Sequence, residues 1–476
     1  MSTRDDGPLD WGSSDEMNAL EVLMWRAEDD PELRSTILLL NVFDRAPDWP
    51  RLHAAHEWGS RMVPRFRKRV AETPLRLGAP YWTLDEDFDL AYHVRRIAVP
   101  EPHSWSAALG LVEQIAMTPF DRARPPWEAY LLEGLSDGRA GYVLKMHHSI
   151  MDGMAGAQLF GELYSRTREP NPDKAQPAPP RDLGPSGTEA LIRQVGRDTL
   201  GAAGLARDLT GRLARSAGRP VGAVSEASRY VASLRRVLAP PDCEPSPLLR
   251  ARSMSSRIVA LDFALADFRA AGKAVGATVN DAFVAAQLGG FRRYHEHFGC
   301  PIERMPISMP ISVRREADQR GGNRFAGASF AAPVGIVDPG ERMRAFGAMV
   351  REARAEPAID GIGFVSPALA RLPGPVVAAF TGALTKSNDL QTSSVPFIRD
   401  EVFMAGAKIE RSFPIGPLPG CAVMGAMITH GDRCCVGMNL DPAAVTDVEL
   451  FGRCLEEGFS EVLALYPQAE PLARLS

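Results

Sequence analysis

Two adjacent histidines, followed by an aspartate and a glycine, are the residues of this chain best suited to chemistry. They form the heptapeptide His147-His148-Ser149-Ile150-Met151-Asp152-Gly153. An imidazole is largely neutral at pH 7 and can still accept a proton, so one histidine could act as a general base. A carboxylate in the following loop could cap a helix and pair with a cation. A glycine there would permit a backbone conformation that a Cβ opposes.

The residues on either side predict how the heptapeptide is held. Residues 142–146 alternate in strand periodicity, and residues 154–167 show helical spacing. The motif is therefore predicted to be a strand end, a short loop and a helix start. If the strand runs through both histidines, they point to opposite faces, so only one can reach a given substrate atom. Two alternatives remain: both rings could be satisfied core groups, or they could bind a metal with a third ligand.

Motifs that the chain lacks narrow the chemistry. There is no GxSxG, no GxxxxGK[ST] and no GxGxxG after a strand. A serine acyl-enzyme of the α/β-hydrolase kind, nucleotide phosphoryl transfer and hydride transfer therefore have no support. A histidine base without an evident protein nucleophile favours direct attack by a bound hydroxyl, amine or thiol acceptor.

The elements that must position the motif are mixed strands and helices in both halves of the chain. Apolar spacing predicts helices over 17–30, 48–70, 104–117, 277–298 and 446–465, and strands over 35–43, 127–135, 141–148, 257–265, 306–313 and 325–334. A hairpin is expected over 421–440, turning at Gly431-Asp432. Thr278 with Asp281, and Thr446 with Glu449, have the spacing of capping boxes. No long βαβ alternation is present.

Between the halves, residues 169–187 are rich in proline and polar residues and predict an exposed linker. Residues 188–215 then combine leucine and valine at helical spacing with interleaved arginines. Such a helix could lie on an anionic membrane surface or pack on the protein as a crossover helix with solvated arginines.

Composition excludes several classes of protein. The chain has 476 residues, of which 45% are hydrophobic and 24% charged, with a net charge of −5. This mix argues against disorder and against a dedicated nucleic-acid binder. No run of about 18 apolar residues predicts a transmembrane helix, and the acidic N-terminus does not resemble a secretory signal. Six cysteines without a CxxC pair indicate reduced, cytosolic usage, and adjacent Cys434 and Cys435 should face opposite sides of a strand.

HHxxxDG after a strand resembles the hallmark of the CoA-dependent acyltransferase superfamily. The chain is more specifically similar to the bacterial wax ester synthase/diacylglycerol acyltransferase family over nearly its whole length. The blocks that carry this resemblance, in order, are FDLAYHVRRIAVPEP (88–102), TPFDRARPPWEAYLLEGL (118–135), KMHHSIMDGMAG (145–156), TVNDAFVAA (278–286), PISVR (310–314), GNRFAG (322–327) and MAGAKIERSFPIGPLPG (404–420).

The resemblance implies a mixed α/β fold with two chloramphenicol-acetyltransferase-like subdomains. A tunnel would run between them, with the histidine loop at its middle, the acyl-CoA entering one mouth and the acceptor the other. We therefore expect an N-terminal subdomain over 1–168, linker and crossover helices over 169–250, and a C-terminal subdomain over 251–476.

By the same resemblance, His148 is the general base and His147 supports it. Asp152 would be structural, pairing with Arg314, beside Gly153 of the motif.

Further residues carry over from other family blocks. Asn280 of the Asn-Asp motif, followed by Asp281, would position the reacting groups; its alternative role is helix-terminal hydrogen bonding beside Thr278. Trp127, in Pro125-Pro126-Trp127, is expected to be a buried architectural residue. The family's Ser-Asn-Val-Pro-Gly stretch is here Ser393-Ser394-Val395-Pro396-Phe397, a departure that could alter chain-length or acceptor choice.

The expected function is transfer of a long-chain acyl group from acyl-CoA to diacylglycerol or a fatty alcohol, giving triacylglycerol or wax ester. Acyl-CoA enters as substrate, and no cofactor, metal or nucleic acid is expected. The protein would be cytoplasmic, in peripheral contact with a membrane or lipid-body surface, and a homodimer is kept open. One alternative is a condensation-like or polyketide-associated acyltransferase with a carrier-protein donor. The other is a non-catalytic lipid binder that uses the basic helix.

Overall fold

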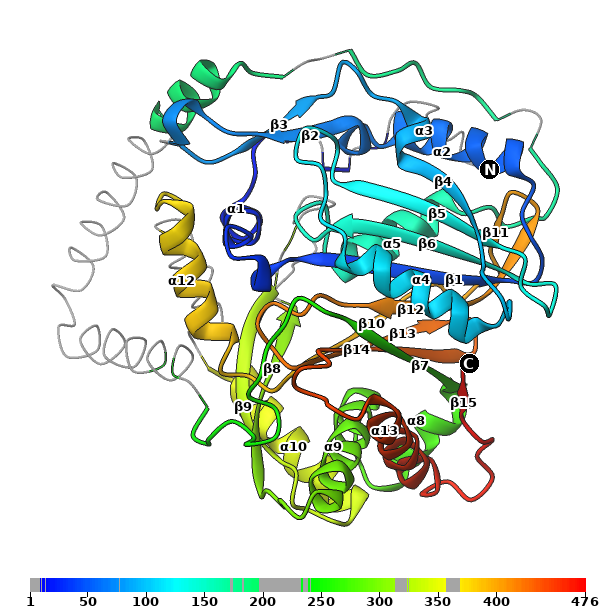
Figure 1. Ribbon diagram of the computed structural model, residues 1–476, viewed down its shortest axis with the longest axis vertical. Helices are drawn as coiled ribbons and strands as arrows, with labels where there is room; N and C mark the ends of the chain where they lie inside the picture. Colours follow the sequence, from blue (N-terminus) through cyan, green and yellow to red (C-terminus); the bar gives the residue numbers. More distant parts are fainter. Residues whose placement is uncertain are drawn as a thin grey trace, which may run out of the picture.

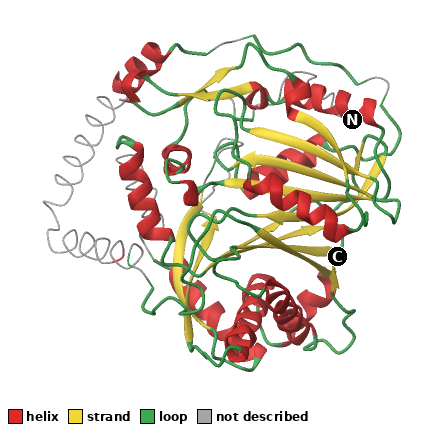
Figure 2. Cartoon of the chain, in the orientation of Figure 1, coloured by secondary structure: helices red, strands yellow, loops and turns green. Residues whose placement is uncertain are grey.

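The computed structural model describes residues 9–476, with the exception of residues 10, 13, 77, 172–173, 182–183, 197–232, 234–238, 240, 313–322, 324 and 357–368. Within these ranges, two large sheets lie one above the other, with helices packed around them (Figures 1 and 2). The fold is mixed α/β, as predicted.

The first sheet holds the histidine motif at the end of a central strand. Its order is β11-β12-β1-β6-β5-β4 among the described residues. The central strand β6 pairs antiparallel with both β1 and β5, and almost every residue of these three strands is buried. The strands are β1 (Thr36–Phe43), β4 (Val94–Ala98), β5 (Trp127–Glu133), β6 (Ala140–His147), β11 (Phe403–Met404) and β12 (Ala407–Ile415).

Helices of the first half surround this sheet and confirm most of the predicted elements. They are α1 (Ala19–Ala27), α2 (Trp49–Met62), α3 (Leu90–His93), α4 (Trp105–Met117) and α5 (Gly153–Leu163). The helix predicted over 48–70 is too long, because α2 ends at Met62. Pro64 disfavours helical geometry at the residue before it, and a 3-10 turn (Pro64–Arg67) leads into β2 (Lys68–Ala71), which pairs with β3 (Tyr81–Leu84).

The second sheet has the order β15-β7-β14-β13-β10-β8-β9 in the described part of the chain. The predicted hairpin of β13 and β14 is present and turns at Gly431, whose φ is +58°. The strands are β7 (Arg257–Ala264), β8 (Arg304–Ser312), β9 (Phe325–Pro333), β10 (Leu390–Pro396), β13 (Val423–His430), β14 (Arg433–Leu440) and β15 (Ala473–Arg474). Cys434 faces the core of the second half, whereas Cys435 faces that of the first, as strand parity predicts.

Helices α8 (Leu265–Ala274), α9 (Val279–His297), α10 (Pro339–Arg354) and α13 (Val448–Leu463) cover the outer side of the second sheet (Figure 1), and α12 (Gly374–Thr385) lies beside α1. The capping box of Thr278 and Asp281 starts α9 as predicted. The box predicted at Thr446 is wrong, because Asp447 caps α13 by accepting a hydrogen bond from Leu450 N–H. An aspartate beside a threonine offers a charged cap that the helix dipole favours.

The second half of the chain contributes β11 and β12 to the first sheet, which the predicted boundaries did not anticipate. β12 pairs antiparallel with β1, so residues 403–415 belong to the first sheet although they lie within the range predicted for the second subdomain. A central β1 needs a hydrogen-bonding neighbour on each edge; β6 provides one and β12 the other.

The proline-rich segment 169–187 runs along the surface near α2 (Figure 1), and its described residues are mostly exposed. Side chains of α2 hold it, since Trp58 and Arg61 donate to the carbonyls of Ala175 and Pro177. Residues 187–196 are helical, and the rest of the basic helix predicted to reach residue 215 lies outside the described residues. In the described part of the chain, none of the helices combines the length and the hydropathy that a membrane span requires.

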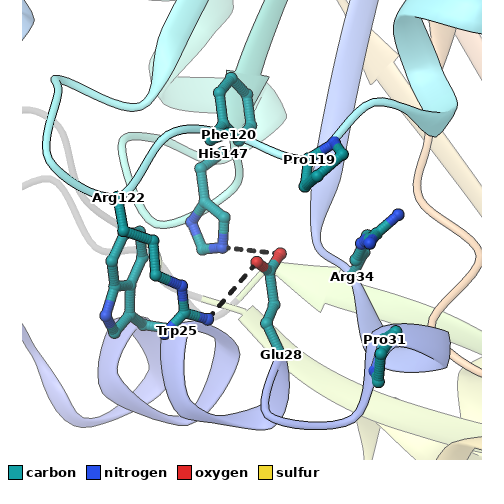
Figure 3. Close-up of a pocket in the computed structure, with 8 residues that line it drawn as sticks. All are labelled: Trp25, Glu28, Pro31, Arg34, Pro119, Phe120, Arg122 and His147. Atoms are coloured by element: carbon teal, nitrogen blue, oxygen red, sulfur yellow. Dashed lines mark ion pairs between the residues drawn. The ribbon is translucent and has the colours of Figure 1, made fainter.

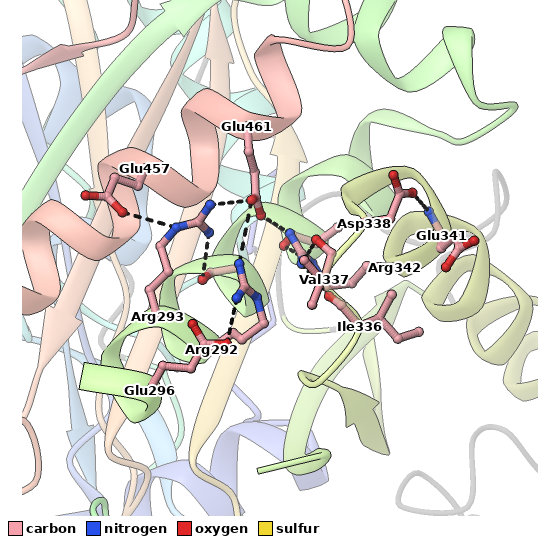
Figure 4. A network of polar contacts seen from close by, with 12 residues as sticks. Arg292, Arg293, Glu296, Ile336, Val337, Asp338, Glu341, Arg342, Glu457 and Glu461 are labelled. Carbon is pink, nitrogen blue, oxygen red and sulfur yellow. Dashed lines mark hydrogen bonds and ion pairs between the residues drawn. The ribbon is translucent and has the colours of Figure 1, made fainter. Parts of the chain in front are cut away.

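A cluster of charged side chains ties α9, α10 and α13 together (Figure 4). Arg342 is completely buried and pairs with Glu461, which also binds Arg293. The Arg342 guanidinium donates as well to the carbonyls of Ala285 and Ile336, at 2.8 and 2.7 Å. These bonds satisfy a cation that burial would otherwise penalise.

Candidate functional site

The histidine motif begins where β6 ends and finishes where α5 begins, so the predicted strand, loop and helix are present. Backbone hydrogen bonds from both flanking strands hold this corner. The N–H of His147 donates to the carbonyl of Pro126 at 2.9 Å, and the N–H of His148 donates to that of Ser35 at 2.8 Å. The two histidines consequently have fixed positions and different surroundings.

His147 is fully buried and lies on the side of α1. The backbone N–H of Ser149 points at its Nδ1 from 3.1 Å, and the Ser149 hydroxyl is 2.7 Å from the same atom. Because a backbone N–H can only donate, Nδ1 is an acceptor, and a neutral His147 carries its proton on Nε2. That Nε2 lies 3.0 Å from Oε1 of Glu28.

Glu28, at the C-terminal end of α1, is a site residue that the sequence reasoning missed. Its Oε1 also accepts the N–H of Ser35 at 2.8 Å, and its other oxygen lies 3.9 Å from Arg122. Burial opposes ionisation of this carboxyl, but the charge and hydrogen bond of His147, the Ser35 N–H and Arg122 together lower the pKa of Glu28. No local motif marks Glu28, since it only meets His147 through the folding of α1 against β6.

Glu28 and His147 face each other in a small pocket of about 100 Å³. Figure 3 shows the two side chains between Trp25 and Arg122 on one side and Arg34 on the other. The pocket is lined by Trp25, Glu28, Pro31, Arg34, Pro119, Phe120, Arg122 and His147.

Replacing Glu28 with alanine is expected to destabilise this corner by about 1–3 kcal/mol, because His147 Nε2–H and Ser35 N–H lose their acceptor. Glu28→Gln keeps an acceptor oxygen and should cost less. The lowered pKa means that the ionised carboxylate contributes stability above its ordinary pKa of 4.5, and that this contribution is lost as pH falls through the lower folded value. Urea midpoints at pH 7 and below pH 4.5 measure both effects; equal midpoints for the two variants would contradict the contact.

His148 is half-buried and contacts Asn323 from the second half of the chain. Its Nδ1 lies 2.9 Å from Asn323 Oδ1, and Asn323 Nδ2 donates to the His148 carbonyl at 2.8 Å. Burial lowers the pKa of His148 and nearby His147 lowers it further, while the charge of Asp152 and the bond to Asn323 oppose the shift. His148 is therefore neutral at pH 7.

Asp152 caps α5, as the sequence predicted. Its Oδ1 accepts the N–H of Ala155 at 2.8 Å. The partner implied for it by the resemblance, Arg314, lies outside the described residues. A cap at this position fixes where the loop ends and the helix begins.

Gly153 is needed for a different reason from the one expected. It is the first residue of α5 and does not have a positive φ, but a Cβ there would lie 3.1 Å from Cγ2 of Val395 in β10. The expectation of an unusual backbone is therefore wrong, and the constraint is the close approach of β10 to α5. Val395 belongs to the segment 393–397 that departs from the family pattern, and the ring of Phe397 in that segment lies 6.4 Å from Phe160 of α5.

Gly153→Ala is expected to lower kcat/KM about 3- to 10-fold, because a displacement of a few tenths of an ångström moves the start of α5 and with it the histidine loop. Adding Val395→Ala removes the opposing methyl groups and should restore most of the activity. Steady-state kinetics of the two single variants and the double variant measure this coupling. Additive losses in the double variant would show that the contact does not set the loop position.

The other predicted site residues lie in supporting positions. Trp127 is buried, donates from Nε1 to the Phe66 carbonyl at 2.7 Å and stacks on His93 with ring centroids 4.6 Å apart, which fits an architectural role. Asn280 lies in the first turn of α9, where its Nδ2 approaches Sδ of Met309 at 3.6 Å. Thr278 and Asp281 close that helix end between themselves.

The described residues contain no group of three or more histidine, cysteine, aspartate or glutamate side chains placed to hold a metal ion. What the motif does bring together is a neutral imidazole fixed at a loop, a second imidazole paired to a carboxylate, and an aspartate that caps the following helix. This arrangement suits proton transfer by His148.

Comparison with known proteins identifies relatives over most of the chain. The model for the wax ester synthase/diacylglycerol acyltransferase catalytic domain matches residues 13–283, and the model for the WS/DGAT C-terminal domain matches residues 321–462. A protein of Mycobacterium tuberculosis (strain ATCC 25618 / H37Rv), named "Putative diacyglycerol O-acyltransferase Rv2484c", is 41% identical over 457 residues, which is 95% of this chain and 92% of that protein. A second protein of that strain with the same kind of name is 30% identical, over 92% of this chain and 94% of its own.

Solved structures share the fold. The wax ester synthase/diacylglycerol acyltransferase from Marinobacter aquaeolei VT8 aligns with a TM-score of 0.62 at 21% identity, covering 95% of this chain and 99% of that one. The first condensation domain of the calcium-dependent antibiotic synthetase aligns with a TM-score of 0.59 at 16% identity, covering 96% and 100%. These likenesses support the predicted fold and, at such identities, only the fold.

Proposed function

The chain belongs to the wax ester synthase/diacylglycerol acyltransferase family and is an acyltransferase, and from this premise we propose that it transfers a long-chain acyl group from acyl-CoA to a lipid hydroxyl. Diacylglycerol is the acceptor that the names of the relatives favour, and a fatty alcohol is the second acceptor class of the family. The products are triacylglycerol or a wax ester.

The observation that carries this proposal is His148, an imidazole neutral at pH 7 and fixed in the loop between β6 and α5. In the proposed reaction, His148 takes the proton of the acceptor hydroxyl as its oxygen attacks the thioester carbonyl. The carbon–sulfur bond then breaks, and His148 returns the proton to the CoA sulfur. The ester and free CoA account for all atoms, and no protein nucleophile is needed.

The first experiment is thiol release from palmitoyl-CoA with a diacylglycerol or hexadecanol as acceptor. We expect release that depends on the acceptor, and the better acceptor identifies the product class. Release only from an acyl-carrier protein would favour the carrier-dependent alternative, which uses the same histidine. Binding to liposomes without release from either donor would favour a non-catalytic lipid binder.

The pH dependence of kcat/KM should reflect His148. Its pKa is lowered from the ordinary value of 6.5, with Asp152 and His147 as the titratable neighbours that act on it. The base is therefore unprotonated above that value, and activity should fall only as pH drops through the lower pKa of the folded protein. Initial rates between pH 5 and 8 measure this limb; a limb well above pH 6.5 would contradict the burial of the ring.

We also propose peripheral contact with a lipid surface, because long-chain acceptors partition into bilayers. The helical segment 187–196 carries two exposed apolar side chains, Ile192 and Val195, which are 65% and 55% exposed. Gln194 of the same segment accepts the Ala79 N–H and so holds the segment on the protein. Vesicle flotation of the native chain beside Ile192→Ser tests this contact.

A further inference from the structure

Asn323 links the catalytic loop to α1, and neither the motif nor the comparisons assign it a role. We propose that Asn323 is a positioning residue that selects the tautomer of His148, with the proton on Nδ1 and the basic lone pair on Nε2. The catalytic consequence rests on the proposed function; the tautomer itself does not.

The orientation of the Asn323 amide follows from its surroundings. Its Nδ2 lies 2.8 Å from the His148 carbonyl oxygen, which can only accept. The carboxyl of Glu21 also lies near Asn323, whose polar groups favour its ionised form and so lower its pKa against the effect of burial. With acceptors on that side, a flipped amide would set oxygen against oxygen, so Oδ1 must face His148.

The tautomer of His148 follows in turn. Oδ1 of Asn323 is an acceptor 2.9 Å from Nδ1, so Nδ1 must carry the hydrogen in this contact. A neutral imidazole with its proton on Nδ1 has its lone pair on Nε2. The same logic gives His147 the opposite tautomer, because Ser149 N–H occupies its Nδ1 and Glu28 faces its Nε2. The two neighbouring histidines therefore differ in which nitrogen is basic, and only His148 presents a basic Nε2.

Residues at the N-terminus of α1 contact Asn323 and hold it in place. Asn18 and Glu21 form a capping box, and Asn18 Nδ2 also donates to the Asn323 carbonyl at 3.4 Å. Burial raises the pKa of Glu21 to about 7, against the charge of Arg65 and the hydrogen bonds of Asn18 and Asn323. Thus the N-terminal end of α1 supports His148 through Asn323, while Glu28 at its C-terminal end holds His147.

The direct test is the tautomer of His148, read from ¹⁵N chemical shifts of the histidine-labelled native chain, with His148→Ala to assign the signal. We expect the Nδ1–H form at pH 8 in the native chain. In Asn323→Leu, the Nε2–H form should become populated, because the leucine side chain offers no acceptor that would favour a hydrogen on Nδ1. A native Nε2–H form, or an unchanged spectrum in Asn323→Leu, would overturn the proposal.

Kinetics provide a second readout that a merely structural role would not move. Asn323→Leu should lower kcat about 10-fold or more with a smaller change in KM. In a fraction of the molecules, Nε2 of His148 then carries the proton and cannot act as the base. Asn323→Asp keeps the acceptor but adds a negative charge next to His148. This charge adds to the effects of Asp152 and His147, which already act on the pKa of His148. The acid limb of kcat/KM should therefore move to higher pH in Asn323→Asp. An unmoved limb would contradict the assignment.

Asn439→Leu is the matched control. Asn439 is equally buried, accepts from Ser256 and donates to the Gly416 carbonyl at 2.8 Å, outside the site. Its replacement should lower stability without changing kcat per folded molecule or the acid limb. If His148→Ala keeps native activity, the proposed function fails while the spectra still decide the tautomer. If His148→Ala is inactive and Asn323→Leu is fully active with a native spectrum, only the role of Asn323 fails.

Discussion

Replacing His148 with alanine is expected to lower kcat for acyl transfer by about 10²- to 10⁴-fold, which is the range that a general base contributes. The variant should fold, because the residue is only half-buried and its two backbone bonds, from its N–H to Ser35 and from Asn323 to its carbonyl, do not involve the imidazole. Thiol release from palmitoyl-CoA with the preferred acceptor measures the loss, and the urea midpoint checks the fold.

His297→Ala is the matched control for this variant. His297 lies in the last turn of α9, is exposed to solvent and is outside the site, so its removal should leave kcat and the urea midpoint unchanged. His147→Ala should differ from both. It removes a fully buried ring held by Glu28 and Ser149, so the loss should appear in stability as well as in rate. Near-native turnover by His148→Ala would exclude it as the base.

Local patterns were enough to predict the strand, loop and helix around the histidines. The alternation before His147 and the capping position of Asp152 are properties of neighbouring residues, and the structure has both. Parity also separated Cys434 from Cys435 into two cores. Elements that are defined within about ten residues could therefore be predicted.

Contacts between distant segments could not be predicted in the same way. Glu28 and Asn323 meet the histidines only after α1 and the segment before β9 have packed against the end of β6. The insertion of β12 into the first sheet likewise depends on pairing with β1 more than 360 residues away, which no local signal encodes.

Gly153 shows that the physical constraint on a residue can differ from the one that the sequence indicates. The sequence marks a glycine after Asp152 but does not reveal whether it serves the backbone or a close neighbour. Only the position of Val395 on β10 decides between the two. Val395 itself matches the family pattern, whereas Phe397 of the same segment departs from it, and its ring lies 6.4 Å from Phe160 of α5.

Glu461→Gln is expected to destabilise the second half by about 3 kcal/mol, since removing one partner of a buried ion pair leaves an uncompensated charge. Burial lowers the pKa of Arg342, as do Arg292 and Arg293, while Glu461 opposes the shift. Without the carboxylate of Glu461, the buried Arg342 cation faces two further arginines.

Glu457→Gln is the matched control (Figure 4), because Glu457 is 66% exposed and pairs with Arg293 at 3.1 Å. That change should cost under about 1 kcal/mol. Urea midpoints of the two variants measure the difference, and equal shifts would mean that burial of Arg342 does not depend on Glu461.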